Sequence, residues 1–293
     1  MDTGKLYTFE DKLKKGQFNL WAQNPGFGGN QPYQPDNQQF YTILYNRSEM
    51  QTVWVDEIPY LLPTGAVMPI MYRQHFRFEK PDSLIALQFN RDFYCVVNHD
   101  KEVGCAGLLF YGLKGVIVLQ PDAIIRKKLD LLLEVFKDEF ETIDDVQGNM
   151  LRMLLVRWII TLTRIARVQY VPAALQSESN LYDAVRQFHT LVEMHFKTNH
   201  EVQFYAEKLF KSPKTLTNQF KKAGISPPLK IINQRRILEA RRMLYYTGLS
   251  VKEIAEELGF EDAANFTRFF KNNTGTSPSE LRNSLRENQI GKN

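Results

Sequence analysis

The sequence contains only two cysteines among its 293 residues, Cys95 and Cys105. Two thiols are too few for the disulfide framework of a small secreted protein, and a reducing cytoplasm is the simplest setting for them. The amino-terminal stretch MDTGKLYTFEDKLKKG is charged from the start and lacks the basic-then-apolar order of a signal peptide. We therefore expect a cytoplasmic protein.

Long hydrophobic runs are also absent. The most apolar segment, residues 150–166, is interrupted by Arg152, Arg157 and Arg164, whereas a membrane-spanning helix needs about 20 nearly uninterrupted apolar residues. Apolar residues make up 43% and charged residues 24% of the sequence, which is typical of a folded globular protein. The length favours roughly two domains, and we expect no membrane partner.

Signals of catalysis are scarce. Before residue 172 the histidines are His75 and His99, and neither belongs to the His-x-His pair that a metal-binding barrel would show. Cys95, His99 and Cys105 are ligand types that bind zinc or copper, but their spacing matches no standard zinc finger. A phosphate-binding glycine loop, a nucleophile elbow and a clustered acid pair are missing. We predict no enzyme, no cofactor and no metal site, and leave the role of these three residues open.

The positive charge is concentrated in the C-terminal part. From Pro172 onward there are 18 Lys and Arg against 13 Asp and Glu, a net charge of +5, whereas the preceding 171 residues carry −1. A basic C-terminal part is the footprint expected of contact with a polyanion, although solvated basic faces are also common in other proteins.

Residues 1–120 have a β-rich pattern. Runs such as FYTILYN, QTVWVDEI and SLIALQFN are rich in aromatic and β-branched residues and are separated by turn-forming stretches. This pattern predicts a sandwich or a jelly-roll barrel. Such a barrel can enclose an apolar or amphipathic ligand, but most of the aromatic residues are expected simply to fill its core.

Residues 121–171 change to a helical period. One amphipathic helix is predicted from Pro121 to about Phe140, and a longer one from Asp144 or Asp145 to Tyr170. The two helices can cover the barrel or pair with the same hairpin of a second copy. The polar stretch PAALQSESN, residues 172–180, is the predicted domain boundary.

Residues 251–282 predict two short helices around a tight turn. Gly259 supplies the backbone freedom for the turn, and Asp262 is a good N-cap for the second helix. That helix has a phenylalanine-rich face and an opposite face of small and polar residues, which suits entry into a DNA major groove. An ordinary helical hairpin is the alternative.

A second copy of this pattern weakens that alternative. Residues 202–227 match residues 251–278 at offsets of 49 to 51. The matching positions in the first copy are Val202, Ala206, Leu209, Leu216, Phe220, Lys221, Gly224, Ser226 and Pro227. Ser212 and Pro213 provide the cap and the first residue of its second helix. The sequence therefore predicts two helix-turn-helix units.

A connecting helix of about 20 residues is predicted between the two units, over PLKIINQRRILEARRMLYYTG. At 1.5 Å per residue it is about 30 Å long, close to the ~34 Å repeat of the major groove on one face of DNA. Its residues Arg235, Arg236, Arg241 and Arg242 are candidates for phosphate contact, with a solvated face as the alternative, and Arg236 is also a candidate for an internal ion pair.

These motifs resemble the AraC/XylS family of bacterial transcriptional regulators. The resemblance covers about residues 180–286 and is carried by Arg236, Ala240, Leu244, Ile254, Ala255, Gly259, Phe260, Phe266, Arg268, Phe270, Lys271, Gly275, Ser277, Pro278 and Arg282. It implies a DNA-binding domain of seven helices. More loosely, the N-terminal part is similar to the cupin-like sensing and dimerisation domain of many members.

The resemblance also implies contact residues. Base contacts fall on exposed positions of the two recognition helices: Lys214, Thr217 and Asn218 in the first, and Ala263, Ala264, Asn265 and Arg268 in the second. Arg and Lys reach guanine, Asn reaches adenine, and methyl groups meet thymine. Because two alanines occupy the second set, Asn265 and Arg268 are expected to do most of its reading. Phosphate contacts are expected from Lys211, Ser212, Lys221, Asp262 and Lys271.

We predict an α+β multidomain protein. Its N-terminal part is a cupin-like β-barrel or jelly roll with a helical hairpin, and its C-terminal part is an all-α domain with two helix-turn-helix units. The predicted parts are the barrel (1–120), the hairpin (121–171), a linker (172–180), the DNA-binding domain (181–286) and a tail (287–293).

The predicted function is sequence-specific binding of operator DNA by a homodimeric transcription regulator. Its N-terminal domain senses a small-molecule effector or dimerises, and RNA polymerase is a candidate further partner. Two alternatives stay open: a barrel enzyme fused to a DNA-tethering module, and a ligand-independent regulator that is controlled by a protein partner.

Overall fold

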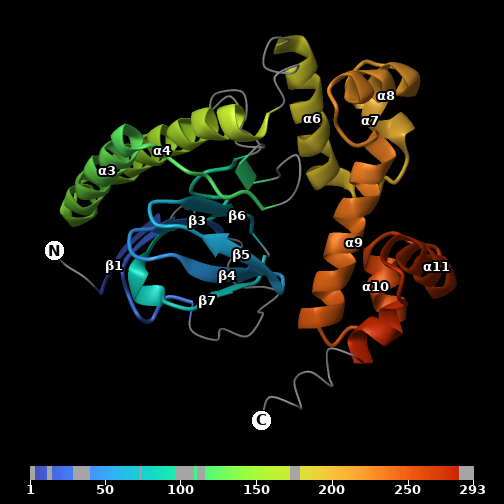
Figure 1. Cartoon of the computed structure of the whole chain (residues 1–293), viewed down its shortest axis with the longest axis horizontal. Helices are drawn as coiled ribbons and strands as arrows, with labels where there is room; N and C mark the ends of the chain where they lie inside the picture. The colour runs from blue at the N-terminus through green and yellow to red at the C-terminus, as the bar shows by residue number, and fades with distance from the viewer. Residues whose placement is uncertain are drawn as a thin grey trace. The chain divides into compact units, whose positions relative to one another are not determined.

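The computed structural model describes residues 4–11, 15–28, 40–72, 74–96, 109–110, 116–171 and 179–283. The chain divides into two compact units, Met1–Val171 and Pro172–Asn293. The first contains two antiparallel sheets and a helical hairpin, and the second is helical (Figure 1). The predicted fold class is therefore confirmed. No helix in the described part of the chain is both long and apolar enough to cross a membrane.

The larger sheet has five antiparallel strands in the order β1-β2-β8-β3-β6. Its strands are β1 (Lys5–Asp11), β2 (Gly16–Ala22), β8 (Leu84–Phe89), β3 (Tyr41–Asn46) and β6 (Val67–Ile70). Strands β3 and β6 are buried along their whole length, because both faces of this sheet are covered. A short 3-10 turn, η1 (Pro81–Ser83), precedes β8.

The smaller sheet has three antiparallel strands in the order β5-β4-β7. These are β5 (Ile58–Leu62), β4 (Gln51–Val55) and β7 (Phe76–Phe78). The two sheets share a core that includes Leu44 and Met68 from the larger sheet and Val53 and Leu62 from the smaller one. Among the described residues, no strand ladder joins the two sheets. They form a two-layered sandwich and not the closed barrel that was one of the predicted outcomes.

The hairpin consists of α3 (Ala123–Glu141) and α4 (Gln147–Tyr170). It packs on the larger sheet through aromatic pairs: Phe18 meets Phe136 at 5.5 Å, and Tyr45 meets Trp158 at 6.2 Å between ring centroids. The hairpin therefore covers its own sheet, which is the first of the two predicted arrangements. Its outer surface still exposes apolar side chains, namely Leu131, Val135, Met150, Met153 and Val168.

The C-terminal unit contains six helices of more than one turn among the described residues: α6 (Ser179–His195), α7 (Val202–Lys208), α8 (Pro213–Lys222), α9 (Pro228–Tyr246), α10 (Val251–Glu257) and α11 (Ala263–Thr274). A further helical stretch spans residues 278–283. Helix α9 is the predicted connector, with α7 and α8 at one end and α10 and α11 at the other (Figure 1).

Some predictions fall on residues that the structure does not describe. His99 and Cys105 lie there, as do residues 172–178 of the predicted linker, residues 284–286 of the predicted DNA-binding domain and the predicted tail (287–293). Cys95 is described and is partly buried. Among the described residues, no cluster of three or more His, Cys, Asp or Glu side chains is arranged to hold a metal ion.

Candidate nucleic-acid interface

The first helix-turn-helix unit is formed by α7 and α8 and rests on α6. The ring of Phe188 on α6 contacts Tyr205 of α7 at 5.4 Å and Phe220 of α8 at 4.9 Å. All three rings are fully buried, so they fix the angle between the two helices. The Ser212 side chain accepts a hydrogen bond from the backbone N–H of Thr215 at 3.1 Å, which confirms the predicted cap of α8.

The second unit is formed by α10 and α11 and has stronger caps. Ser250 and Glu253 form a reciprocal capping box at the start of α10. The Asp262 carboxylate accepts from the backbone N–H of Asn265 at 2.6 Å, so the predicted cap of α11 is confirmed. Phe266 and Phe270 are fully buried under α11, as its apolar pattern predicts.

The turns of the two units use different residues for the same backbone conformation. Gly259 has φ of +69°, and a side chain there would run into the backbone oxygen of Lys197. In the first unit the equivalent position is Phe210, whose φ is +55° and whose side chain is 98% exposed. A non-glycine residue in this region is strained by about 1–3 kcal/mol. Phe210 does not stand out in the sequence, because aligned patterns of apolar residues do not report backbone conformation.

The first recognition helix presents the predicted residues to solvent. Lys214, Thr217 and Asn218 are all exposed on α8, on the side opposite the buried Leu216 and Phe220. They offer an ammonium group, a hydroxyl with a methyl group, and an amide, which together can address any base edge.

The second recognition helix holds its polar side chains in a chain of hydrogen bonds. The Asn265 amide nitrogen donates to Asp262 at 2.9 Å, and the Arg268 guanidinium donates to the Asn265 carbonyl oxygen at 2.8 Å. Asn265 therefore keeps one N–H and one lone pair for another partner, whereas Arg268 keeps most of its donors. Ala264 is exposed and Ala263 is partly buried beside them. The spacing i, i+3, i+6 from Asp262 could have indicated this network in the sequence.

The expected phosphate-contacting side chains lie mostly at the surface. Ser212, Lys221, Asp262 and Lys271 are exposed, and Lys211 is partly buried. Exposure makes these residues available to DNA. Ser212 and Asp262 are also the N-caps of α8 and α11, so the N-terminus of each recognition helix lies next to them.

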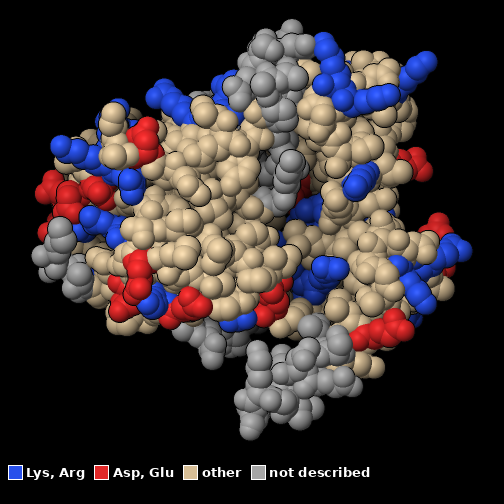
Figure 2. All heavy atoms as spheres, viewed as in Figure 1, with Lys and Arg blue, Asp and Glu red and all other residues tan. Residues whose placement is uncertain are grey.

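The two units differ in charge. Residues 202–227 contain five Lys against one Glu, a net charge of +4, whereas residues 251–278 contain three Lys and Arg against five Asp and Glu, a net charge of −2. Figure 2 shows Lys and Arg gathered over the end of the helical unit that carries α8, and mixed signs over α10 and α11. Attraction to a polyanion therefore comes mainly from the first unit.

The predicted phosphate role of the connector arginines is wrong for three of the four. Arg235 and Arg242 are buried and share the carboxylate of Glu239, at 2.9 and 3.2 Å. Arg235 also pairs with Glu193 of α6 at 2.8 Å. Although burial lowers the pKa of Arg235, the carboxylates of Glu193 and Glu239 raise it overall. Only Arg241 of this run is exposed.

Arg236 is also internal, but it does not form the ion pair that was considered for it. Its guanidinium lies 4.0 Å from the ring centroid of Phe260 and 4.7 Å from that of Phe269, and no carboxylate among the described residues pairs with it. Burial lowers its pKa to about 10, so it stays protonated at neutral pH. Arg236 therefore fixes the second unit to α9 by cation–π contact.

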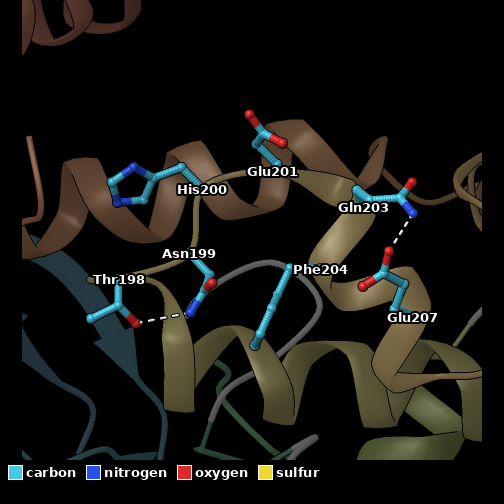
Figure 3. Close-up of a pocket in the computed structure, with 7 residues that line it drawn as sticks. All are labelled: Thr198, Asn199, His200, Glu201, Gln203, Phe204 and Glu207. Carbon is cyan, nitrogen blue, oxygen red and sulfur yellow. Dashed lines mark hydrogen bonds between the residues drawn. The ribbon is translucent and has the colours of Figure 1, made fainter.

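An open pocket of about 420 Å³ lies where α6 leads into α7 (Figure 3). Its lining includes Glu201, Glu207, His200 and Phe204, and Gln203 donates to Glu207 at 2.5 Å. The lining contains two acids and neither Lys nor Arg, so its charge does not suit a phosphate group. No sequence motif indicated this pocket, and its lining includes none of the expected DNA-contacting residues.

The helix-turn-helix region is similar to known proteins. Residues 205–284 match a family described as a helix-turn-helix domain. The chain is 32% identical over 118 residues to the uncharacterised HTH-type transcriptional regulator YobQ of Bacillus subtilis, covering 40% of this chain and 46% of that protein. It is 29% identical over 136 residues to the uncharacterised regulator YijO of Escherichia coli, covering 46% and 47%.

A domain of a response regulator is among the solved structures that are similar to part of this chain. It is the C-terminal domain of the two-component response regulator yesN from Fusobacterium nucleatum, with 31% identity, coverage of 34% of this chain and 98% of that chain, and a TM-score of 0.32. The chain spans about half the length of the two relatives above.

Proposed function

We propose that this chain, whose C-terminal unit contains an AraC-type helix-turn-helix DNA-binding domain, regulates transcription by binding a specific duplex DNA site. The observation that carries the proposal is the pairing of two such units on the single helix α9. This helix has 19 residues and is therefore about 28 Å long. That length suits two recognition helices in successive major grooves, which lie ~34 Å apart.

The two recognition helices have different tasks in this proposal. On α8, the exposed Lys214, Thr217 and Asn218 meet base edges, and the surrounding lysines Lys211 and Lys221 bind phosphates. The net charge of +4 on this unit makes it the main source of affinity.

On α11, Arg268 is the principal reader. Its free donors suit a bidentate contact with guanine O6 and N7. Asp262 accepts a hydrogen bond from Asn265, and Asn265 accepts one from Arg268 and thereby orients it. Asn265 keeps one N–H and one lone pair with which to contact a DNA base itself. Ala263 and Ala264 contribute methyl contacts, and Lys271 binds phosphate.

The N-terminal unit senses an effector and mediates dimerisation in this proposal. The apolar side chains exposed on α3 and α4 form a surface that a second copy of the same hairpin can cover. Between the two sheets, packed side chains of the shared core occupy the space among the described residues. An effector therefore has better access to a pocket at the surface of this unit than to the space between the sheets. We assign the protein no catalytic role, place it in the cytoplasm, and keep RNA polymerase as a candidate partner.

A binding selection tests the proposed function. The purified full chain is mixed with random duplex DNA, bound duplexes are sequenced over several rounds, and affinity for the enriched duplex is compared with that for a scrambled one at fixed salt. We expect a motif of two blocks and a preference of at least ~10³-fold for the enriched duplex. Failure to enrich any sequence would overturn the proposal.

A further inference from the structure

A basic pocket lies in the N-terminal unit, where three segments far apart in the sequence meet. It has a volume of about 350 Å³ and is lined by the end of β3, the loop before β6 and the first turns of α3. The side chains that bear on its chemistry are Tyr45, Arg47, Thr64, Arg126, Lys127 and Asp130.

The pocket has an excess of positive charge. Arg47, Arg126 and Lys127 face one acid, Asp130. Asp130 is engaged, because it lies 3.4 Å from the Nε of Arg47 and accepts a hydrogen bond from the Tyr45 hydroxyl at 3.2 Å. Arg126 and Lys127 have no acidic partner among the described residues. The positive charges of these two side chains are therefore not neutralised by an acid in the described part of the chain.

The Arg126 side chain lies directly over Gly65. Gly65 is buried with φ of +76°, and its N–H donates to the backbone oxygen of Asn46 at 2.7 Å. A Cβ added at Gly65 would lie 2.5 Å from the Cδ and 2.7 Å from the Nη1 of Arg126. The loop thus favours glycine here for its backbone conformation, and the absence of a side chain lets the arginine approach closely. Arg126 is partly buried here and lies against the loop instead of extending into solvent.

We propose that this pocket binds a small molecule that carries a phosphate or carboxylate group. The planar guanidinium of Arg126 suits bidentate contact with either group, and Lys127 adds a second positive charge. The pocket is within the size range of small-ligand sites and too small for a macromolecule.

Two hydroxyl groups complete the chemistry of the pocket. Thr64 lies at its exposed rim. Burial and the neighbouring Asp130 raise the pKa of Tyr45 to about 12, so its phenol remains a hydrogen-bond donor at neutral pH. A ligand that competes with Asp130 for Tyr45 and Arg47 gains both of these donors.

The position of the pocket allows a bound ligand to affect the packing of the N-terminal unit. An anion bound between Arg126 of α3 and the loop that contains Thr64 joins the helical hairpin to the sheet. This step deepens the proposed function, because it takes the N-terminal unit as the sensing part and names the chemical class that it senses.

Thermal unfolding of the full chain tests the proposal. Inorganic phosphate and succinate are titrated separately at constant ionic strength, on the wild type, Arg126→Gln and Lys128→Gln. Lys128 is exposed on the same helix and does not line the pocket, so its variant matches the loss of charge. At ten times the dissociation constant of an anion that binds, we expect Tm of the wild type and of Lys128→Gln to rise by about 3–6 °C. Arg126→Gln should give no rise.

The phosphate and succinate arms distinguish the two ligand chemistries, and a response to either supports the proposal. Equal rises in all three proteins would show a general salt effect and overturn it, as would the lack of any rise with both anions. If Arg126→Gln does not fold, Lys127→Gln at an exposed position of the pocket takes its place and should lower the response.

DNA affinity is measured in parallel. A wild type that responds to anion but binds no DNA contradicts the proposed function alone, and the converse result contradicts the pocket alone.

Discussion

The two helix-turn-helix units share a pattern of buried residues but differ in almost everything that faces solvent. The first has a net charge of +4, and the second has a net charge of −2. The first presents three separate polar residues on its recognition helix, whereas the second presents Arg268 in a hydrogen-bonded chain with Asn265 and Asp262. In the proposed function the two copies therefore have different tasks: the first supplies electrostatic affinity, and the second supplies an oriented reader.

The units also differ in how their turns are made. The turn of the second unit is closed against Lys197 and tolerates only glycine at position 259, whereas the turn of the first unit is open and carries the exposed Phe210. The second unit is further fixed to α9 by Arg236 against Phe260. The closed turn and the Arg236 contact hold the second unit in position, which the oriented reading proposed for it requires.

The largest expected effect comes from the support that both units share. Glu239→Ala removes the carboxylate that lies between Arg235 and Arg242 in the middle of α9. Two buried guanidinium groups lose a partner, and we expect the free energy of unfolding to fall by about 3–5 kcal/mol. Urea unfolding of the full chain measures the change. Arg241→Ala, an exposed neighbour, is the control and should stay within about 0.5 kcal/mol of the wild type. A loss below about 1 kcal/mol for Glu239→Ala would show that the buried ion pairs do not hold α9.

The next largest effect separates the two turns. Gly259→Ala places a Cβ against the Lys197 backbone oxygen at a positive φ, and we expect about 2–4 kcal/mol of destabilisation. The matched change in the first unit, Phe210→Gly, relieves a strained conformation and removes an exposed side chain. It should leave stability unchanged within about 1 kcal/mol. The same urea unfolding assay compares the two variants, and equal losses would contradict the difference between the turns.

A smaller effect tests the reader. Arg268→Ala should weaken binding to the selected duplex by about 1–3 kcal/mol and relax the preference at one base pair. Arg268→Lys keeps the charge but loses the planar fork, so it should lose the same preference while keeping the salt dependence. Fluorescence anisotropy with duplexes changed at single positions measures both variants. If Arg268→Ala retains full preference at every position, Arg268 is not a reader.

The smallest effect concerns phosphate binding. Lys221→Ala should weaken selected and scrambled duplexes alike and reduce the slope of log affinity against log salt by about one unit. Lys252→Ala, an exposed lysine on the acidic α10, should change the slope less. Salt titrations by anisotropy give the slopes. A loss confined to the selected duplex would assign Lys221 to base contact instead.

Local features were predictable from the sequence because short-range rules govern them. The caps at Ser212 and Asp262, the turn at Gly259 and the buried Phe266 and Phe270 follow from residue type and spacing within one or two turns of helix. The duplicated pattern then gave the architecture of the C-terminal unit.

Features made by distant segments were not predictable in this way. From the sequence alone, Arg235 is expected on a solvent-exposed helix face. Its ion-pair partner Glu193 lies 42 residues earlier in the chain, so local spacing does not indicate the pair. The pocket around Arg126 depends on Gly65 in the loop before β6. Whether the strands close into a barrel or pack as two sheets depends on long-range pairing, which alternating apolar residues do not specify. The base and phosphate contacts remain predictions, since exposure makes them available but does not show DNA against them.

Footprinting on the selected duplex tests the central claim, that two unequal units read adjacent grooves. Hydroxyl-radical cleavage is compared for the wild type, Lys214→Ala and Arg268→Ala. The account predicts two protected patches on one face of the DNA, about 10–10.5 base pairs apart, with each variant weakening a different patch. A single protected patch, or one patch weakened by both variants, would contradict it.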